Sequence, residues 1–284
     1  CIQHCKDWEG KLGTVGQFFY DLNCIRNARK QNFDILLQLG YTSSSVWKNL
    51  LPKKAVIVTN MDGLEWKRSK FSKPVQQFLK KAEKWAIESS DHLIADSKGI
   101  QQYLNQSHAT ESTYIAYGSH LFSDSNESYL EGYGVEKSNY NMLIARMEPE
   151  NNVEVILDGV VQSKNSSPFL VVGNTNNRFG QYLIDKFKDN ENIQFIGGVY
   201  DLSALNNLRF FSKLYFHGHS VGGTNPSLLE AMASSAFIVS HKNEFNSAVL
   251  EASAIYFSTS DDISRIINQP IMPEKRKSFI QLNR

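Results

Sequence analysis

Short apolar segments recur along the chain and alternate with stretches whose apolar residues have helical spacing. The first half has four such segments: Ile35–Leu39, Ala55–Thr59, His92–Asp96 and Thr113–Tyr117. The second half has six: Asn141–Ala145, Phe169–Gly173, Ile193–Ile196, Leu214–His217, Ala236–Ser240 and Ala254–Phe257. Nearly all are continuous apolar runs, which are typical of strands buried on both faces of a parallel sheet.

The intervening stretches predict amphipathic helices. The clearest one has apolar residues at the spacing of one helix face: Val75, Phe78, Leu79, Ala82, Trp85 and Ala86. Strands and helices therefore alternate, which predicts an α/β protein with right-handed crossovers. Six strands suit a complete doubly wound domain in the second half, whereas four strands in the first half predict a Rossmann-like domain truncated at its N-terminus.

The alternation lapses between Ser119 and Ser138, a polar stretch with two glycines that predicts a linker. We therefore predict a first domain over 1–120, a linker over 121–138 and a second domain over 139–268. The first domain is expected to be incomplete, since the chain starts at Cys1 without a methionine. The tail, 269–284, has two prolines and a basic cluster, and it either packs back on the first domain or lies on the surface.

Charge and cysteine content argue against several classes of protein. The 30 basic and 29 acidic side chains leave a formal net charge of +1, which argues against a dedicated nucleic-acid binder. Three cysteines in 284 residues indicate a reducing compartment such as the cytoplasm. Cys1, His4 and Cys5 lack the further ligands that a metal site needs. No apolar run is long enough to predict a membrane span, and no signal peptide is evident.

The segment His219–Glu230 carries the strongest local signal for binding. Two glycines follow a predicted strand, and Thr224 or Asn225 then suits the N-cap of a helix whose first residue is Pro226. Such a turn at the carboxyl end of a parallel strand is typical of an anion site, because free N–H groups and the helix dipole favour negative charge. The alternative is a well-capped helix after an ordinary loop.

Glu230 lies one turn inside this predicted helix. Beside a bound phosphate, a carboxylate is suited to accept hydrogen bonds from a ribose diol, as the acidic residue of dinucleotide-binding domains does. The alternative is a solvated helix glutamate, and the spacing alone leaves both interpretations open.

The stretch Gly218–Ser235 resembles the nucleotide-sugar motif of family 4 retaining glycosyltransferases, which have the GT-B fold of two Rossmann-like domains facing a cleft. In that family the motif reads E-G-x-G-x-P-x-x-E-A-M-A. The residues that match its second half are Glu230, Ala231, Met232 and Ala233, and Pro226 lies one position before the motif's proline. Gly222 stands where the family has its first glutamate, near the donor sugar, and His219 or Asn225 is expected to take over that contact.

Further stretches resemble the same family. Ala145–Val153 resembles the element after the first strand of the donor domain, in which Arg146 matches the arginine that neutralises the diphosphate and Asn151 replaces the usual lysine. Phe169–Asn174 resembles the strand that ends in a glycine turn, and Phe195–Asp201 resembles the segment that lines the base pocket. The resemblance assigns donor binding to Arg146, Asn152, Gly173, Asn174, Tyr200, His219, Gly222, Gly223, Thr224, Asn225 and Glu230.

In the first half, Val58–Arg68 and Ala95–Gly99 resemble a subgroup associated with rhamnosyl transfer in bacterial surface polysaccharides such as capsules. That subgroup reads H-G-x-x-W-K-R. Here the segment Asn60–Gly63 lacks the histidine, because Asp62 falls on its position and Gly63 on that of the glycine. Asp62 follows a predicted strand and is our candidate for a residue near the acceptor; the alternative is a capping aspartate at a turn. The chain has no Asp-x-Asp motif, so we expect neither a metal nor any cofactor besides the nucleotide-sugar substrate.

Together these features predict a metal-independent retaining glycosyltransferase with Asp62 and Glu230 as catalytic candidates. It would move a hexose, rhamnose in that subgroup, from a nucleotide sugar to an oligosaccharide or lipid-linked glycan. A sugar-nucleotide epimerase and a non-catalytic nucleotide-sugar-binding protein are the alternatives. The cations of the predicted helix Trp66–Ser90 either form a solvated face or contact anionic lipid on the inner face of the cell membrane.

Overall fold

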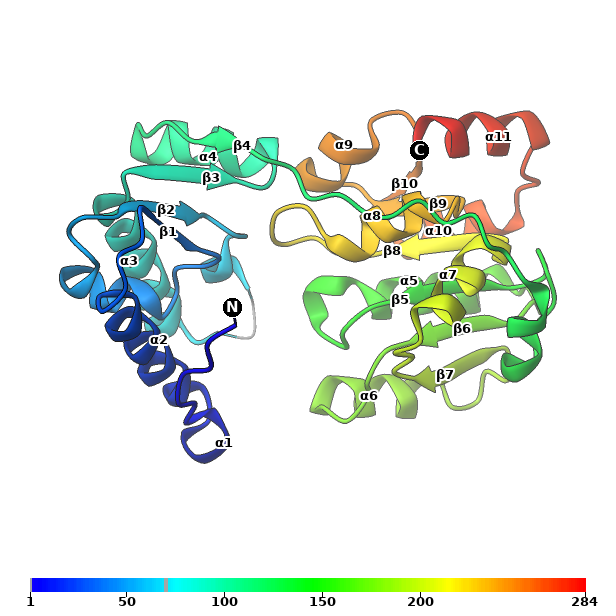
Figure 1. Cartoon of the computed structure of the whole chain (residues 1–284). Helices are drawn as coiled ribbons and strands as arrows, with labels where there is room; N and C mark the ends of the chain where they lie inside the picture. The colour runs from blue at the N-terminus through cyan, green and yellow to red at the C-terminus, as the bar shows by residue number, and fades with distance from the viewer. Residues whose placement is uncertain (1, 69–70) are drawn as a thin grey trace. The chain divides into compact units, whose positions relative to one another are not determined.

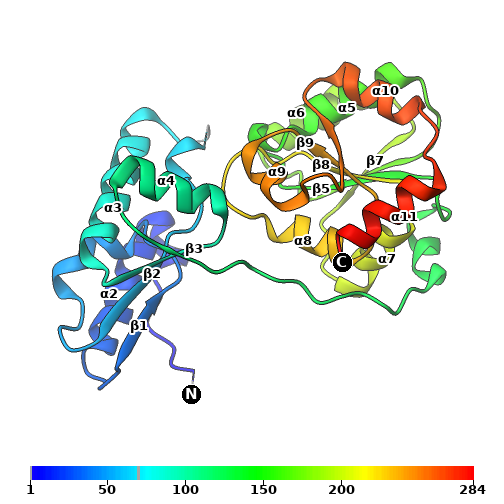
Figure 2. The same cartoon turned by 90° about the horizontal axis from the view of Figure 1, so that it is seen from above.

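The computed structural model describes residues 2–68 and 71–284. The chain forms two compact units, Cys1–Ala116 and Tyr117–Arg284, and each unit contains one parallel sheet with helices around it (Figure 1 and Figure 2). The predicted architecture of two Rossmann-like α/β units is therefore confirmed.

The sheet of the first unit has the strand order β1-β2-β3-β4, and all its neighbouring strands are parallel. Its strands are β1 (Ile35–Gln38), β2 (Val56–Asn60), β3 (His92–Ala95) and β4 (Thr113–Tyr114). Its helices, with η marking a 3-10 helix, are α1 (Glu9–Leu12), α2 (Thr14–Ala28), η1 (Ser44–Leu50), η2 (Glu65–Lys67), α3 (Lys73–Ser89) and α4 (Lys98–His108). The predicted strands are present, although β4 is shorter than the apolar run that predicted it.

Helix α3 follows the predicted apolar spacing. Pro74 lies in its first turn, where the missing backbone N–H has no cost, and Leu79, Ala82 and Ala86 are buried along one face. The opposite face carries exposed lysines. No helix in the described part of the chain is both long and apolar enough to cross a bilayer.

The second unit has a six-stranded parallel sheet in the order β10-β9-β8-β5-β6-β7. Its strands are β5 (Asn141–Ile144), β6 (Phe169–Val172), β7 (Ile193–Gly197), β8 (Leu214–His217), β9 (Ile238–His241) and β10 (Ile255–Phe257). The chain proceeds outward from β5 on one side and then from β8 on the other. The strand order thus reverses between β5 and β8, and in such sheets ligands bind beyond the carboxyl ends of the strands at this point.

Helices cover both faces of this second sheet. They are η3 (Glu127–Tyr133), η4 (Pro149–Asn151), α5 (Val153–Ser163), α6 (Arg178–Phe187), α7 (Leu202–Phe211), α8 (Pro226–Ala233), α9 (Glu244–Leu250), α10 (Ser260–Asn268) and α11 (Pro273–Leu282). Helices α5, α6 and α10 pack on one face, and α7, α8 and α9 contribute to the core on the other. The strands β5, β6 and β8 are buried on both faces, which explains their continuous apolar sequences.

The predicted linker over 121–138 is instead part of the second unit. The amide of Phe122 donates to the carbonyl of Ala233, and Leu130 and Val135 are buried in the core beside α7. The prediction was wrong because a polar sequence conceals these few apolar anchors. Burial of Leu130 and Val135 holds the segment on the sheet.

The tail over 269–284, which is predicted to pack on the first domain or to lie on the surface, packs on the second unit. It forms α11, in which the ring of Phe279 stacks on Phe237 at 5.5 Å. The guanidinium of Arg276 donates to the backbone carbonyls of Lys213 (2.9 Å) and Ser212 (3.0 Å). The basic cluster therefore includes a cation that pairs with the backbone carbonyls preceding β8.

Candidate functional site

The loops after β5 and β8 are in direct backbone contact where the strand order reverses. A Cβ atom on Gly218 would lie 2.0 Å from the carbonyl oxygen of Asn151, so only glycine fits there. The amide of Asn152 donates to the carbonyl of Gly218 over 2.8 Å, and Asn152 itself has a left-handed backbone with φ of 51°. The side chain of Asn152, a predicted site residue, thus links the loop after β5 to the loop after β8.

Asn151, the residue that replaces the usual lysine, does not face a ligand. Its side chain is buried, and its amide donates to the carbonyl of Arg146 over 2.7 Å. Arg146, in contrast, is exposed at the same edge of the sheet. The described residues give its guanidinium no ion pair, so its charge is available to an anion.

The turn after β8 is anchored at its start. The carbonyl of His219 accepts hydrogen bonds from the side-chain amides of Asn243 and Asn246, each at 2.9 Å. Ser220 donates to the carbonyl of Glu150 through its amide (3.1 Å) and its hydroxyl (2.7 Å). These contacts fix the place at which the glycine turn leaves the sheet.

The backbone at Gly222 explains why no glutamate stands at this position. Its φ is +119°, a backbone conformation that L side chains rarely adopt, although an added Cβ would meet no heavy atom within 4 Å. Glycine is therefore required here for the path of the backbone rather than for space. Within the described ranges, no acceptor pairs with the backbone N–H groups of Gly222 and Gly223.

Helix α8 begins as the sequence predicts. Asn225 is the N-cap, its side-chain oxygen accepts a hydrogen bond from the amide of Ser227 (2.9 Å), and Pro226 occupies the first turn. Thr224 is buried just before the cap. Of the two residues that suited the N-cap, Asn225 is therefore the one that takes the position.

Glu230 pairs with a buried arginine that the sequence analysis did not identify. Its Oε2 atom lies 2.5 Å from Nη2 of Arg209 in α7, whose side chain is 1% exposed against 37% for Glu230. The guanidinium also donates to Ser227 (3.3 Å) and Asn206 (3.1 Å). Arg209 and Glu230 are 21 residues apart, so no local pattern links them.

A second residue missed by the sequence analysis is His217, the last residue of β8. Its ring is fully buried and stacks on the ring of His219 with centroids 4.6 Å apart. Burial, followed by the charges of His219, Arg209 and His241, lowers the pKa of His217 well below 6.5. A neutral imidazole therefore lies beneath the predicted donor-site residue His219.

The remaining donor candidates lie on the neighbouring strands. Gly173 follows β6, and a Cβ there would meet the carbonyl of Ala145 at 2.0 Å, so the end of β6 also contacts the loop after β5. Asn174 is exposed, and its side chain accepts a hydrogen bond from the amide of Asn176. Tyr200, after β7, is 89% exposed. Among the residues that the structure describes, the contact with Asn176 is the one hydrogen bond of the Asn174 side chain, and the side chain of Tyr200 makes none.

Asp62 belongs to the first unit, whereas every donor candidate belongs to the second. It follows β2 and is exposed, and within the described ranges its carboxylate has no hydrogen bond or ion pair. Its side chain therefore caps no turn and remains open to solvent.

The first unit contains a buried carboxylate that the sequence analysis also missed, and one of its partners, Trp66, lies in the segment that follows Asp62. Glu83 of α3 accepts hydrogen bonds from Tyr103 (2.7 Å), Trp66 (3.2 Å) and Tyr41 (3.4 Å). His108 Nε2 lies 2.9 Å from the same carboxylate. Burial and the contact with Glu83 raise the pKa values of both tyrosines, which keeps their hydroxyls protonated as donors.

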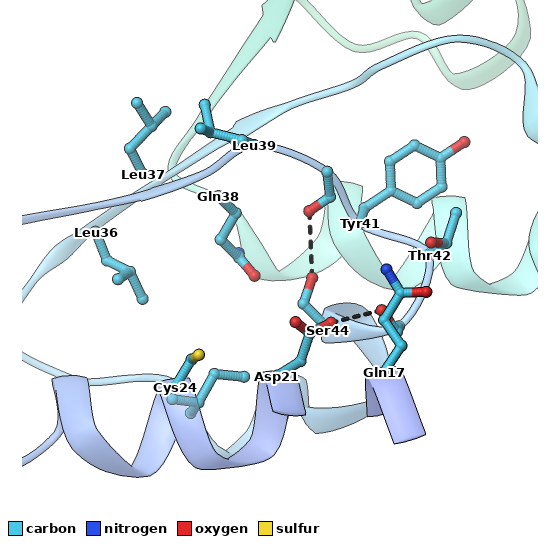
Figure 3. Close-up of a pocket in the computed structure, with 13 residues that line it drawn as sticks. Gln17, Asp21, Cys24, Leu36, Leu37, Gln38, Leu39, Tyr41, Thr42 and Ser44 are labelled. Atoms are coloured by element: carbon cyan, nitrogen blue, oxygen red, sulfur yellow. Dashed lines mark hydrogen bonds between the residues drawn. The ribbon is translucent and has the colours of Figure 1, made fainter. Parts of the chain in front are cut away.

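A pocket of about 350 Å³ lies beside the edge strand β1, next to α2 (Figure 3). Its polar wall includes Asp21, which accepts a hydrogen bond from the hydroxyl of Ser43 (2.5 Å). Burial raises the pKa of Asp21. None of the predicted site residues lines this pocket.

Across residues 2–68 and 71–284, no three His, Cys, Asp or Glu side chains are grouped as a metal site requires.

Comparison with known proteins identifies the family. The sequence profile described as glycosyl transferases group 1 matches residues 127–281, which is more than half of the chain. The chain belongs to the glycosyl transferases of group 1. A profile for a domain of unknown function, DUF1972, matches residues 17–120. A sequence search among curated proteins found no match.

Solved structures similar to this group 1 glycosyltransferase cover nearly the whole chain. HepE from Anabaena, in complex with UDP and glucose, has a TM-score of 0.75 at 17% identity, over 96% of this chain and 77% of that one. Sucrose-phosphate synthase from Thermosynechococcus elongatus has a TM-score of 0.77 at 14% identity, over 99% and 80%. For α,α-trehalose 6-phosphate synthase from Burkholderia multivorans the values are 0.69, 11%, 96% and 72%.

These comparisons confirm two predictions from sequence. The fold is that of GT-B glycosyltransferases, and the protein is a glycosyltransferase. At such low identities the structural likeness speaks for the fold, and the choice of donor, acceptor and stereochemistry depends on the site itself.

Proposed function

We propose that the protein transfers a sugar from a nucleoside-diphosphate donor to a glycan, with retention of configuration at the anomeric carbon. The observation that carries the proposal is the turn at Gly222 and Gly223. It places two N–H groups, for which the described residues supply no acceptor, before the N-terminus of α8, where the strand order of the second sheet reverses. Backbone N–H groups and a helix N-terminus stabilise a diphosphate.

Departure of the diphosphate is the step that this arrangement favours. Negative charge develops on the leaving oxygens, and preorganised donors around such charge are usually the largest catalytic contribution. The amides of Gly222 and Gly223 and the exposed guanidinium of Arg146 are the donors we assign. We propose that His219 or Asn225 contacts the sugar in place of the absent glutamate and that Asn174 and Tyr200 lie on the side of the base.

Glu230 is assigned to the ribose. Its carboxylate lies one turn inside α8, beside the proposed diphosphate position, and is 37% exposed. In dinucleotide-binding domains an acidic residue likewise accepts hydrogen bonds from ribose hydroxyls beside a phosphate-binding turn, although from a later position in the chain. Because HepE was solved with UDP and with UDP-glucose, we propose a uridine diphosphate sugar as the donor and no bound metal.

The acceptor is proposed to be a growing bacterial surface polysaccharide or a lipid-linked oligosaccharide, with rhamnose as the candidate sugar. Asp62 is our candidate for the residue beside the acceptor hydroxyl, because its carboxylate is exposed at the end of β2. The exposed lysines of α3, among them Lys73 and Lys81, would bring this unit to an anionic membrane surface that carries the acceptor.

The proposal is tested by incubating the protein with UDP-, dTDP- and GDP-sugars, with and without rhamnose-containing oligosaccharides and lipid-linked glycans. We expect transfer only when an acceptor is present, and a product with the same anomeric configuration as the donor by NMR. An inverted product would contradict retention. An epimerised donor formed without acceptor would indicate an epimerase, and binding without turnover would indicate a non-catalytic binding protein.

A faster test is thermal unfolding with UDP, dTDP and GDP. A ligand that binds only the folded protein raises the unfolding temperature. We expect a rise with at least one of these diphosphates and a smaller rise in Arg146→Gln. If none of the three changes the unfolding temperature, the proposed donor site is wrong.

A further inference from the structure

Arg209 is the largest fully buried side chain of the described chain, and its charge faces the residue that we assign to the ribose. A guanidinium stays charged at every physiological pH, so a buried one needs a partner. Its ion-pair partner is Glu230, at 2.5 Å between Nη2 and Oε2. The Glu230 carboxylate therefore stabilises the buried charge of Arg209, and Arg209 in turn holds the carboxylate in its orientation.

The contact engages only one side of the carboxylate. Oε2 accepts from Arg209, whereas within the described ranges no hydrogen bond reaches Oε1. The partners also differ in exposure, since Arg209 is 1% exposed and Glu230 is 37% exposed. One oxygen of Glu230 is thus tied to the protein interior, and the other remains available to accept a hydrogen bond.

The guanidinium is in turn held by the start of α8. Its Nη2 atom donates to the hydroxyl of Ser227 (3.3 Å), which also contacts the hydroxyl of Tyr215 (3.1 Å). Ser227 is the residue whose amide is capped by Asn225. On the other side, Nη1 donates to Asn206 of α7 (3.1 Å). Arg209 therefore contacts both the Glu230 carboxylate and Ser227 at the start of α8. Through these contacts it links the orientation of Glu230 to the helix that follows the glycine turn.

From this geometry we infer that Arg209 is a positioning residue for recognition of the donor's ribose: it fixes the Glu230 carboxylate so that its free oxygen accepts from the ribose hydroxyls. This inference rests on the proposed function. A long glutamate side chain that is already held in one orientation loses less freedom when the ligand binds. The alternative is that Arg209 only ties α7 to α8.

The experiment compares a nucleoside diphosphate with its counterpart that lacks the ribose hydroxyls. Calorimetry gives the Kd of UDP or GDP, whichever binds, and of its 2′,3′-dideoxy analogue, for the wild type, Arg209→Met, Arg209→Lys and Glu230→Ala. If only dTDP binds, which already lacks the 2′-hydroxyl, it is compared with its 3′-deoxy analogue. In the wild type we expect the dideoxy analogue to bind about 10-fold or more weakly, as for loss of a hydrogen bond to a charged group. Glu230→Ala should abolish this preference.

Arg209→Met should reduce the preference for the diphosphate with ribose hydroxyls to within about 3-fold, while the dideoxy analogue keeps its wild-type Kd. The double variant with Arg209→Met and Glu230→Ala should bind both diphosphates as Glu230→Ala alone does. Arg209→Lys, which keeps the charge but not the planar fork, should fall in between, and it replaces Arg209→Met if that variant does not fold. The matched control is Arg276→Met, which changes a half-buried arginine of the second unit. Arg276 pairs with backbone carbonyls, and its replacement should keep the full preference.

The outcomes separate this inference from the proposed function. If Arg209→Met weakens both diphosphates equally, Arg209 is only structural and the inference is overturned. If the wild type binds both diphosphates equally well, Glu230 does not contact the ribose, so the inference fails while the donor site stands. If the wild type binds none of the diphosphates, the proposed function itself fails.

Discussion

The two units fix the segments at the carboxyl ends of their strands in different ways. In the second unit uncharged groups do this: Gly218 and Gly173 allow backbones to touch, and Asn152, Asn243 and Asn246 donate to loop carbonyls. In the first unit a single buried carboxylate, Glu83, holds the segments after β1 and β2 and helix α4. Close backbone contact demands glycine at fixed positions and leaves a readable motif, whereas a carboxylate with scattered donors leaves none.

The strongest test of this comparison is Gly218→Ala. The new methyl group would lie 2.0 Å from the carbonyl of Asn151, so the loops after β5 and β8 must separate. A displacement of about 1 Å at a reacting centre costs about 100-fold in rate. We expect the separation of the two loops to reduce transferase activity by at least that factor. The control is Gly132→Ala, where an added Cβ meets no atom within 4 Å. Full activity in Gly218→Ala would show that the contact is dispensable.

Glu83→Ala tests the first unit. It leaves two hydroxyls, an indole N–H and an imidazole without their acceptor, and we expect the unfolding free energy of this unit to fall by about 3–5 kcal/mol. All four tryptophans lie in this unit, so fluorescence during urea unfolding reports on it alone: Trp8, Trp47, Trp66 and Trp85.

The control for that measurement is Glu88→Ala on the same helix. Glu88 is exposed and pairs with Lys48 and Lys84 at the surface, so its removal should change the unfolding midpoint little. Equal effects of the two substitutions would contradict the assigned role of Glu83.

The buried imidazole of His217 predicts a pH dependence in the second unit. Its pKa is lowered in the folded protein, mainly by burial, whereas an unfolded histidine has a pKa of about 6.5. Below that pH the unfolded chain binds one more proton, so stability should fall as the pH drops from 7.5 to 5.5. His217→Phe should reduce this fall, measured as the unfolding temperature by calorimetry. His241, whose pKa burial also lowers, is the comparison, and an unchanged slope in His217→Phe would refute the assignment.

The smallest effect is expected at the exposed lysines of α3. Lys73→Glu and Lys81→Glu should each weaken binding to vesicles with anionic lipid by about 5-fold or more, since a cation near such a surface contributes about 1 kcal/mol. The loss should disappear at high salt. Lys188→Glu, an exposed lysine of the second unit, is the control. Equal binding by all variants would favour an ordinary solvated face.

Much of the second unit could be predicted from the sequence. Its apolar strands, the N-cap at Asn225 and the glycine turn follow from local rules, because each depends on a few consecutive residues. The prediction of a linker was wrong, because buried anchors such as Leu130 are few among polar neighbours. In the tail, partly buried residues such as Phe279 pack α11 on the second unit.

The sequence by itself determined the alternation of strands and helices, the parallel sheets and the family. These features depend on apolar runs and on glycines that local stretches of sequence contain. Only the tertiary structure decided which charges meet. Arg209 and Glu230 are 21 residues apart, and Glu83 and Tyr41 are 42 apart. A buried charge is stable wherever the fold supplies a partner, and that partner can come from any segment that the packing brings near.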